Sequence, residues 1–384
     1  MSISVKMQQY ALGSSFIRKM FEEGARLKSE YGEANVFDFS LGNPDIAPPP
    51  EVLQTMCEEA SSMFHGYMPN AGYMDVRQRV AEYATGEYEV KLIPEDIIMT
   101  CGAGAGMNVV LKSIIDPDDE IIAIAPYFVE YRFYAENYGG KLVSVSCDDT
   151  FLPDIDCIRS SITERTKAII INSPNNPSGR VYPEEILAGF SKMLENYPRI
   201  MLISDEPYRR LVYDNRKVPS VLKLIPNSVV VTSASKDLSL AGQRIGYIVL
   251  GPGIENKDNL ANALIMANRI LGFVNAPALM QRILARCIHM SIDVNIYARR
   301  RDALCAMMDS AGLEYAPPEG AFYLFVKSPI PDDVEFCSVL QKEKILAVPG
   351  TGFGYPGYVR FAYCCEEDKI KAAGPGLLHA LRSL

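Results

Sequence analysis

Residues 233–246 have the sequence SASKDLSLAGQRIG and lie between two apolar segments, Val229–Thr232 and Tyr247–Leu250. Short runs rich in Val and Ile are typical of buried parallel strands. Similar runs recur through the middle of the chain with helix-like stretches between several of them, and this alternation predicts an α/β fold with a mostly parallel, seven-stranded sheet. The remaining predicted strands are Ile97–Met99, Ile121–Ala125, Lys141–Val145, Ala168–Ile171 and Met201–Ser204, and the helices between them are Gly106–Ile115, Val129–Tyr138 and Pro183–Asn196.

The two ends of the chain have a different pattern, which predicts a second, smaller α+β domain wrapped on the central one. The expected elements are helices over Phe16–Glu30, Ile296–Ser310, Val334–Glu343 and Lys369–Leu381, and strands over Val36–Leu41, Ala321–Val326 and Val359–Tyr363. We expect an N-terminal arm and small-domain segment over residues 1–45, a large domain over 46–285 and the C-terminal part of the small domain over 286–384.

The composition limits the classes of protein to which this chain can belong. Its 384 residues contain 38 Lys and Arg against 47 Asp and Glu, and the net charge of −9 argues against a nucleic-acid partner, which needs surplus positive charge. No apolar run approaches the roughly 20 residues that span a bilayer, so no membrane partner is expected. The N-terminus lacks a signal-peptide pattern, and nine cysteines without a CxxC motif suggest reduced thiols and a cytoplasmic location. Three histidines that never cluster with cysteine make a metal site unexpected.

Lys236 lies in the polar loop between the two apolar segments, at the end of a predicted buried sheet. Open α/β sheets bind ligands in the crevice at the carboxyl ends of their strands. A lysine there can lose its proton through desolvation or nearby positive charge and become a nucleophile toward carbonyl groups. Ser233 and Arg244 flank it with a hydroxyl and a planar cation, which suit a phosphate. On these residues alone, a surface lysine beside an arginine is an equally good interpretation.

An acidic residue, Asp205, follows the apolar strand Met201–Ser204. A carboxylate at the end of such a strand is costly to bury unless a cation faces it. Tyr208 follows shortly after and can offer a phenolic hydrogen bond. Taken alone, Asp205 is better explained as the cap of a following helix than as a catalytic group.

A loop dense in asparagine and proline, NSPNNPSG at residues 172–179, follows the strand Ala168–Ile171. A plain turn would account for Asn, Pro and Gly at this position. Two prolines and two adjacent asparagine side chains are nevertheless more than a turn requires, which favours a functional role.

A glycine-rich loop, CGAGAGM at residues 101–107, connects the strand Ile97–Met99 to a predicted helix. Main-chain N–H groups at a helix N-terminus form an anion site. The loop does not match GxGxxG, because Met107 stands where the third glycine is needed, and it lacks the lysine of a P-loop. Nucleotide and dinucleotide cofactors are therefore disfavoured. A small phosphate and tight helix packing remain as the two explanations of the glycines.

In this order along the chain, the four motifs resemble the class I/II aminotransferases, which are pyridoxal 5'-phosphate (PLP) enzymes of fold type I. The resemblance extends over about residues 14 to 365 and is specific in combination, since no single motif decides it. It implies the PLP-dependent transferase fold type I and an enzyme similar to aspartate or aromatic aminotransferases. Further matching segments are LGNPD at 41–45, Tyr67 ahead of NAGY at 70–73, PYFVEY at 126–131, GAFY at 320–323 and VRFAY at 359–363.

The resemblance implies a role for each residue at the PLP site. Lys236 would hold PLP as a Schiff base, and Asp205 would face the pyridine nitrogen and keep it protonated. Tyr208 and Asn176 would contact the phenolic oxygen of the cofactor. The other implied contacts are Ser233, Arg244 and the main-chain amides of Ala103 and Gly104 at the phosphate, Phe128 against the ring, and Tyr67 at the phosphate of the neighbouring subunit in a homodimer with shared active sites.

The substrates implied by the resemblance are an L-amino acid and a 2-oxo acid. Arg360 would bind the α-carboxylate as a bidentate pair, with help from Asn176 and the main chain at Gly42. The released Lys236 amine would then act as the general base at Cα. A PLP-dependent carbon–sulfur β-lyase is the alternative function, because the same residues would serve it. A non-catalytic PLP-binding regulator is a remote alternative.

Other details also come only from the resemblance. The side-chain pocket of the substrate would be lined from the N-terminal segment and from both subunits, which makes Arg18, Arg269 and Asn275 candidates for it. Phe128 departs from the Trp or Tyr that is usual at the ring-stacking position. The peptide bonds Ala125–Pro126 and Asn176–Pro177 are expected to be cis.

Overall fold

The computed structural model describes residues 3–12, 16–61 and 65–384 and has a large and a small domain. The large domain is built on a seven-stranded sheet with the order β2-β8-β7-β6-β5-β3-β4. Only β8 runs antiparallel to its neighbours within this sheet, so the predicted mostly parallel α/β sheet is confirmed. The strands are β2 (Ile97–Thr100), β3 (Glu120–Ala125), β4 (Lys141–Ser146), β5 (Thr166–Asn172), β6 (Met201–Asp205), β7 (Ser228–Ser233) and β8 (Gly246–Leu250).

The central strands are buried on both faces, which explains why their sequences are continuously apolar rather than alternating. Successive residues of a strand point to opposite faces. Ile203 therefore packs with the helices on one face of the sheet, and Leu202 packs with those on the other. Helices α5 (Ala103–Ile114), α6 (Glu130–Glu136) and α10 (Lys257–Ile270) cover the first face, and α7 (Ile155–Ser160), α8 (Glu184–Leu194) and α9 (Val221–Leu224) cover the second.

A further group of helices packs beside β2 and β8 at the edge of the sheet. It contains α3 (Pro50–Ala60), α4 (Met74–Tyr88) and α11 (Ala278–Cys287), which bury Val52, Val80 and Ile283 against one another. The short N-terminal helix α1 (Val5–Leu12) lies against α6, where the Tyr10 hydroxyl donates to Glu136.

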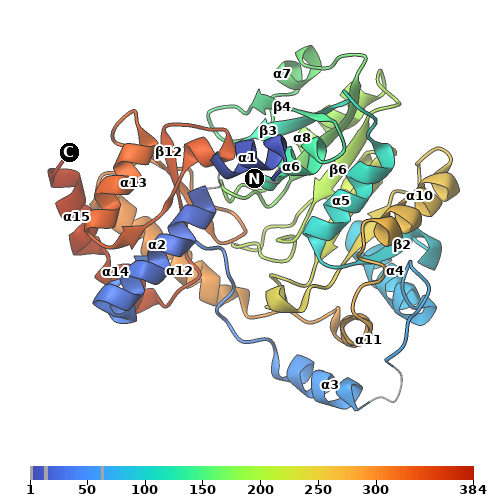
Figure 1. Cartoon of the computed structure of the whole chain (residues 1–384), viewed down its shortest axis with the longest axis horizontal. Coiled ribbons are helices and arrows are strands. Elements are labelled where there is room, and N and C mark those ends of the chain that lie inside the picture. The colour runs from blue at the N-terminus through green and yellow to red at the C-terminus, as the bar shows by residue number, and fades with distance from the viewer. Residues whose placement is uncertain (1–2, 13–15, 62–64) are drawn as a thin grey trace.

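The small domain combines both ends of the chain, as predicted. In Figure 1 the blue α2 lies among the orange and red C-terminal elements. Residues close to the N-terminus contribute β1, which pairs with β10 in parallel, and a separate antiparallel sheet has the order β11-β12-β9. The elements are α2 (Phe16–Tyr31), β1 (Phe37–Asp38), α12 (Val294–Ser310), β9 (Tyr323–Lys327), α13 (Asp333–Lys342), β10 (Ile345–Leu346), β11 (Val348–Pro349), β12 (Tyr358–Ala362), α14 (Glu367–Ala372) and α15 (Gly374–Arg382).

Two predicted elements of the small domain are wrong in extent. The strand expected over Val36–Leu41 is only two residues long, because the chain leaves β10 after Asp38 to cross toward the large domain. The helix expected over Lys369–Leu381 is two helices, since Pro375 belongs to the first turn of α15 and cannot continue α14. The domain boundaries at residues 46 and 286 stay a prediction. No helix in the described ranges combines the length and the apolar character needed to cross a membrane.

The strand register brings polar residues from three neighbouring strands to one edge of the large sheet. Asn172 at the end of β5 pairs with Asp205 at the end of β6, and Asp205 pairs with Val231, two residues before Ser233 at the end of β7. Parallel strands place their carboxyl ends at the same edge. The apolar sequences of these strands therefore position the candidate site.

Close packing of α5 on the sheet gives a prediction about stability. A Cβ added at Gly106 of α5 would lie 2.6 Å from Cγ1 of Val231, whereas a Cβ at the helical Gly86 would meet nothing within 4 Å. We expect Gly106→Ala to lower the free energy of unfolding by about 1–3 kcal/mol through overpacking. Gly86→Ala is the matched control and should raise it by about 0.5–1 kcal/mol. Urea denaturation measures both, and a Gly106→Ala protein as stable as the parent would refute the packing explanation.

Candidate active site

The polar strand ends open into a cavity of about 380 Å³, a size suited to a small organic ligand. The cavity is lined by the large domain, by the segment that follows β1 and by β9 and β12 of the small domain. Except for Tyr67, all residues predicted at the site line it: Gly42, Ala103, Gly104, Phe128, Asn176, Asp205, Tyr208, Ser233, Lys236, Arg244 and Arg360.

Lys236 extends across the cavity to the segment after β1. Its Nζ donates a hydrogen bond to the main-chain oxygen of Gly42 at 2.8 Å. Burial lowers the pKa of Lys236 to about 8, and the positive charges of Arg360 and Arg244 act in the same direction. A lysine amine that loses its proton near neutral pH can act as a nucleophile and as a base.

Gly42 is required at this contact by its closeness to Tyr323. A Cβ at position 42 would lie 1.8 Å from Oη of Tyr323, well inside the van der Waals distance. Tyr323 in turn hydrogen-bonds Tyr208, with 3.0 Å between the two hydroxyl oxygens. The segment that carries Gly42 therefore lies directly on the tyrosine pair.

Asp205 has one satisfied and one unsatisfied carboxylate oxygen. The Tyr131 hydroxyl donates to Oδ2 at 2.6 Å, whereas Oδ1 is buried and has no hydrogen-bond partner among the described residues. Burial raises the pKa of Asp205 to about 7, although the Tyr131 hydrogen bond favours the ionised form. A buried oxygen of this kind calls for a donor. A protonated ring nitrogen of a ligand in the cavity would supply one.

Asn172 connects Asp205 to the NSPNNPSG loop, a role that the sequence interpretation missed. Its Nδ2 donates to the Asp205 main-chain oxygen at 2.7 Å, and its Oδ1 accepts from the main-chain N–H of Asn176 at 2.7 Å. Ala125–Pro126 and Asn176–Pro177 are cis, as expected, and Ser173–Pro174 is also cis. Its position as the last residue of β5 and the first of the NSPNNPSG segment is the signal that identifies Asn172.

Arg360 is a buried cation without a carboxylate partner in the described chain. Only 2% of it is exposed, and its Nη1 and Nη2 donate to Asn176 Oδ1 at 3.0 Å and to the Ser40 main-chain oxygen at 2.6 Å. Its Nε is buried with no partner. Burial lowers the pKa of Arg360, because a desolvated guanidinium is costly without a counter-charge. An incoming carboxylate would supply that charge and accept from the fork of donors.

The opposite end of the cavity is built to hold an anion. Ala103 and Gly104, the first residues of α5, line it. This 12-residue helix begins at the cavity, and its first main-chain N–H groups have no partner within the helix. Arg244 lies beside them and donates to the main-chain oxygens of Ala241 and Cys101. Gly102 has φ +82, and a Cβ there would approach Nη2 of Arg244 to 2.7 Å, which explains the glycine.

Tyr67 and two candidates for the substrate side-chain pocket, Arg269 and Asn275, do not line the described part of this cavity. Tyr67 is 88% exposed and does not line the cavity of its own chain. Arg269 is exposed on α10 beside Met266, and Asn275 donates to main-chain oxygens of residues 68 and 69, so neither lines the cavity. The side chain of Arg18 lies outside the described residues.

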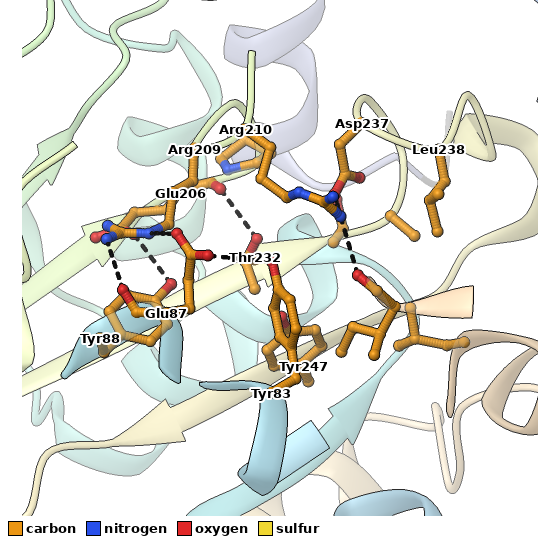
Figure 2. Close-up of a pocket in the computed structure, with 15 residues that line it drawn as sticks. Tyr83, Glu87, Tyr88, Glu206, Arg209, Arg210, Thr232, Asp237, Leu238 and Tyr247 are labelled. Carbon is orange, nitrogen blue, oxygen red and sulfur yellow. Dashed lines mark hydrogen bonds and ion pairs between the residues drawn. The ribbon is translucent and has the colours of Figure 1, made fainter. Parts of the chain in front are cut away.

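A second, smaller pocket lies behind the segment that carries Asp205 and Tyr208 (Figure 2). The Glu206 carboxylate faces it and accepts from Ser204, Tyr88 and Arg209 at 2.6, 3.0 and 2.9 Å. Since all three donors are buried, Glu206 is a satisfied buried charge rather than a candidate ligand. Adjacent residues thus point to opposite sides, Asp205 into the cavity and Glu206 into the rear pocket.

Comparisons with known proteins agree with this geometry. Residues 34–374 match the family model of aminotransferase class I and II. A probable aspartate/prephenate aminotransferase of Thermus aquaticus is 33% identical over 350 residues, which cover 89% of this chain and 91% of that protein. An aminotransferase structure from Eubacterium rectale has a TM-score of 0.96 and 37% identity, covering 100% and 99% of the two chains. The Thermus thermophilus aspartate aminotransferase determined with maleate has a TM-score of 0.91 and 27% identity, covering 99% and 100%.

These matches extend over nearly the whole chain and join the sequence motifs to a single fold. The protein is an enzyme that transfers amino groups between amino acids and keto acids. Its chain belongs to the class I and II aminotransferases, with the fold type I architecture.

Proposed function

We propose that the cavity binds PLP and that Lys236 is its point of covalent attachment. The observation that carries this proposal is the presence of the partly buried lysine and the open oxygen of Asp205 in one cavity. The N-terminus of α5, with Ser233 and Arg244 beside it, suits the phosphate of the same molecule. When bound, PLP supplies an aldehyde that combines reversibly with amines and a ring that absorbs the electrons released at Cα.

Lys236 acts in this proposal as the group that moves the proton at the substrate Cα. A pKa of about 8 leaves a useful fraction of the amine unprotonated near neutral pH. The Gly42 carbonyl gives the amine a fixed direction. Tyr208, held by Tyr323, and Asn176 are the groups that contact the phenolic oxygen of the cofactor, and Phe128 packs against its ring.

Arg360 binds and orients the substrate carboxylate. Its guanidinium is held by Asn176 and by Ser40, so the carboxylate meets donors whose positions are already fixed. A fixed carboxylate restricts rotation about Cα and places the Cα–H bond for proton removal. The names of the Thermus relatives support L-aspartate as the first amino donor to test. We take 2-oxoglutarate as the 2-oxo acid acceptor for that assay.

The working unit in this proposal is a homodimer with shared active sites. Tyr67 is exposed, and the bond from Asn275 Nδ2 to Met68 holds its segment against the end of α10. That surface also exposes Met266 and Ile270, which are 49% and 58% exposed. Tyr67 would contact the phosphate bound by the second subunit. The location proposed is the cytoplasm, whose reducing conditions suit nine free cysteines, all of which lie in the described ranges.

Substitution of the proposed attachment residue tests the function directly. With PLP, the parent protein should acquire a visible absorbance band and convert L-aspartate and 2-oxoglutarate to oxaloacetate and L-glutamate. We expect Lys236→Ala to lose the band and at least about 10²–10⁴ of the turnover, because both the attachment and the base are removed. Lys223→Ala, at an exposed lysine, is the control. Normal turnover by Lys236→Ala would refute the assignment, and pyruvate with ammonia from cystathionine would support the β-lyase alternative.

The proposed carboxylate site predicts a separate effect on substrate binding. Arg360→Lys keeps the charge but loses the planar fork, so the KM for the amino acid should rise by about 10- to 100-fold. The affinity for PLP, followed by absorbance, should change little, because Arg360 contacts the substrate end of the cavity. Arg79→Lys, on the exposed side of α4, is the matched control. An unchanged KM would remove Arg360 from the substrate site.

A mixture of two inactive chains tests the shared site. Tyr67→Phe should weaken PLP binding by about 10- to 100-fold, the value of a hydrogen bond to a charged group. Lys236→Ala and Tyr67→Phe chains are unfolded and refolded together at a PLP concentration too low for the Tyr67→Phe protein. Hybrid dimers contain one site with both native residues, so activity should return. Each chain refolded alone is the control, and absence of complementation by a mixture that does form dimers would exclude the sharing of Tyr67.

A further inference from the structure

The residue after Lys236 is directed away from the cavity, into the rear pocket. Asp237 lies there opposite Arg210, with 3.5 Å between Oδ2 of Asp237 and Nη1 of Arg210 (Figure 2). Oδ1 of Asp237 is buried and has no partner among the described residues. Residues 234–240, which include Lys236, are here called the lysine loop. This loop and the loop of Tyr208 each place one charged side chain in the rear pocket, Asp237 and Arg210 respectively.

Arg210 also hydrogen-bonds to the residues that directly follow α11. Its guanidinium donates to the main-chain oxygens of Ile288, His289 and Met290, with distances of 2.9 Å to the first two. Ile288 is the C-cap of α11, and a carbonyl at the end of a helix has no partner within the helix. His289 and Met290 lie just beyond the helix. The planar guanidinium has five donors in a fixed geometry and can serve several separated carbonyls at once, whereas the donors of a lysine radiate from a single nitrogen atom.

The lysine loop is bonded to the same region by its backbone. The main-chain oxygen of Asp237 accepts from the Ile292 N–H at 2.8 Å and from the Ser291 hydroxyl at 3.3 Å. Residues 288–293, here called the connector, lead from α11 to α12, the first C-terminal helix of the small domain. Arg210 and Asp237 thus fasten both active-site loops to the connector.

Lys236 is also bonded to the other passage between the domains, the segment after β1, through Gly42. The small domain carries Arg360 on β12, so the distance between the amine and the guanidinium depends on how the two passages are held. We propose that Arg210 and Asp237 are positioning residues. They hold the lysine loop against the connector and thereby fix the position of the Lys236 amine relative to the Arg360 guanidinium. This inference rests on the proposed function of Lys236 and Arg360.

A positioning role and a purely structural role predict different effects on catalysis. The side chains of Arg210 and Asp237 are only 22% and 17% exposed, so removal of either partner should also lower the free energy of unfolding. A displacement of a reacting group by about 1 Å can lower the rate by about 100-fold. Loss of the contact should therefore lower kcat by more than the loss of another buried arginine, such as Arg77, that contacts neither loop.

The test compares Arg210→Met, Arg210→Lys and Asp237→Asn with Arg77→Met. Arg77 is also buried and donates to a main-chain oxygen, that of Ile97 at 2.8 Å, but it contacts neither the lysine loop nor the connector. For Arg210→Met we expect kcat to fall by about 10- to 100-fold, with KM within about threefold of the parent. The pH midpoint of the bound cofactor's visible absorbance should shift, because the surroundings of Lys236 change. Arg210→Lys and Asp237→Asn should be intermediate, and Arg77→Met should match the parent in both measurements.

Hydrogen exchange without cofactor gives a second measurement. Amides of residues 236–240 and 288–293 should exchange faster in Arg210→Met than in Arg77→Met. Unchanged kcat and midpoint in Arg210→Met and Asp237→Asn, or equal losses in Arg77→Met, would overturn the positioning role. If Arg210→Met does not fold, the same comparison is decided by Arg210→Lys and Asp237→Asn. A parent protein with no visible band and no turnover would overturn the proposed function and this inference together, whereas an active parent with unaffected variants overturns the inference alone.

Discussion

The hydrogen bond from Tyr131 to Asp205 is the interaction on which the rest of the site depends. It satisfies one oxygen of a buried carboxylate and leaves the other open to the cavity. Burial raises the pKa of this carboxyl group to about 7, so a positively charged ligand group would stabilise its ionised form. The apolar strands that bury Asp205 and the polar network around it are consequently parts of one arrangement. Asn172 completes it, because it holds the main chain of Asp205 and of the neighbouring loop with a single side chain.

The charges around the cavity select the kind of molecule that enters it. Lys236, Arg244 and Arg360 are the cations among its described lining residues, and Asp205 is the acid. This positive excess in a partly enclosed site attracts anions and repels cations, although the chain as a whole has a net charge of −9. Phosphates and carboxylates therefore meet a favourable local field within an acidic protein. The two outer cations lie at separate places, Arg244 beside α5 and Arg360 on β12, which matches one ligand anion at each end.

The large sheet and most of the site could be predicted from the sequence because both follow from the ends of buried strands. Continuous Val and Ile runs identify the strands, and the polar residue after each run must lie at the common edge. Contacts between segments distant in sequence could not be obtained this way. The Tyr131 bond to Asp205 and the Tyr208 bond to Tyr323 depend on how helices and the small domain pack, and no local pattern encodes that packing.

The contact between Gly42 and Tyr323 has a consequence for the variation that this enzyme tolerates. Any amino acid other than glycine at position 42 would place its Cβ 1.8 Å from the phenol oxygen, so one of the two groups would have to move. If the backbone at Gly42 moved, its carbonyl oxygen would no longer accept the hydrogen bond from the Lys236 amine. Position 42 therefore accepts a side chain only if Tyr323 or the backbone of this segment shifts.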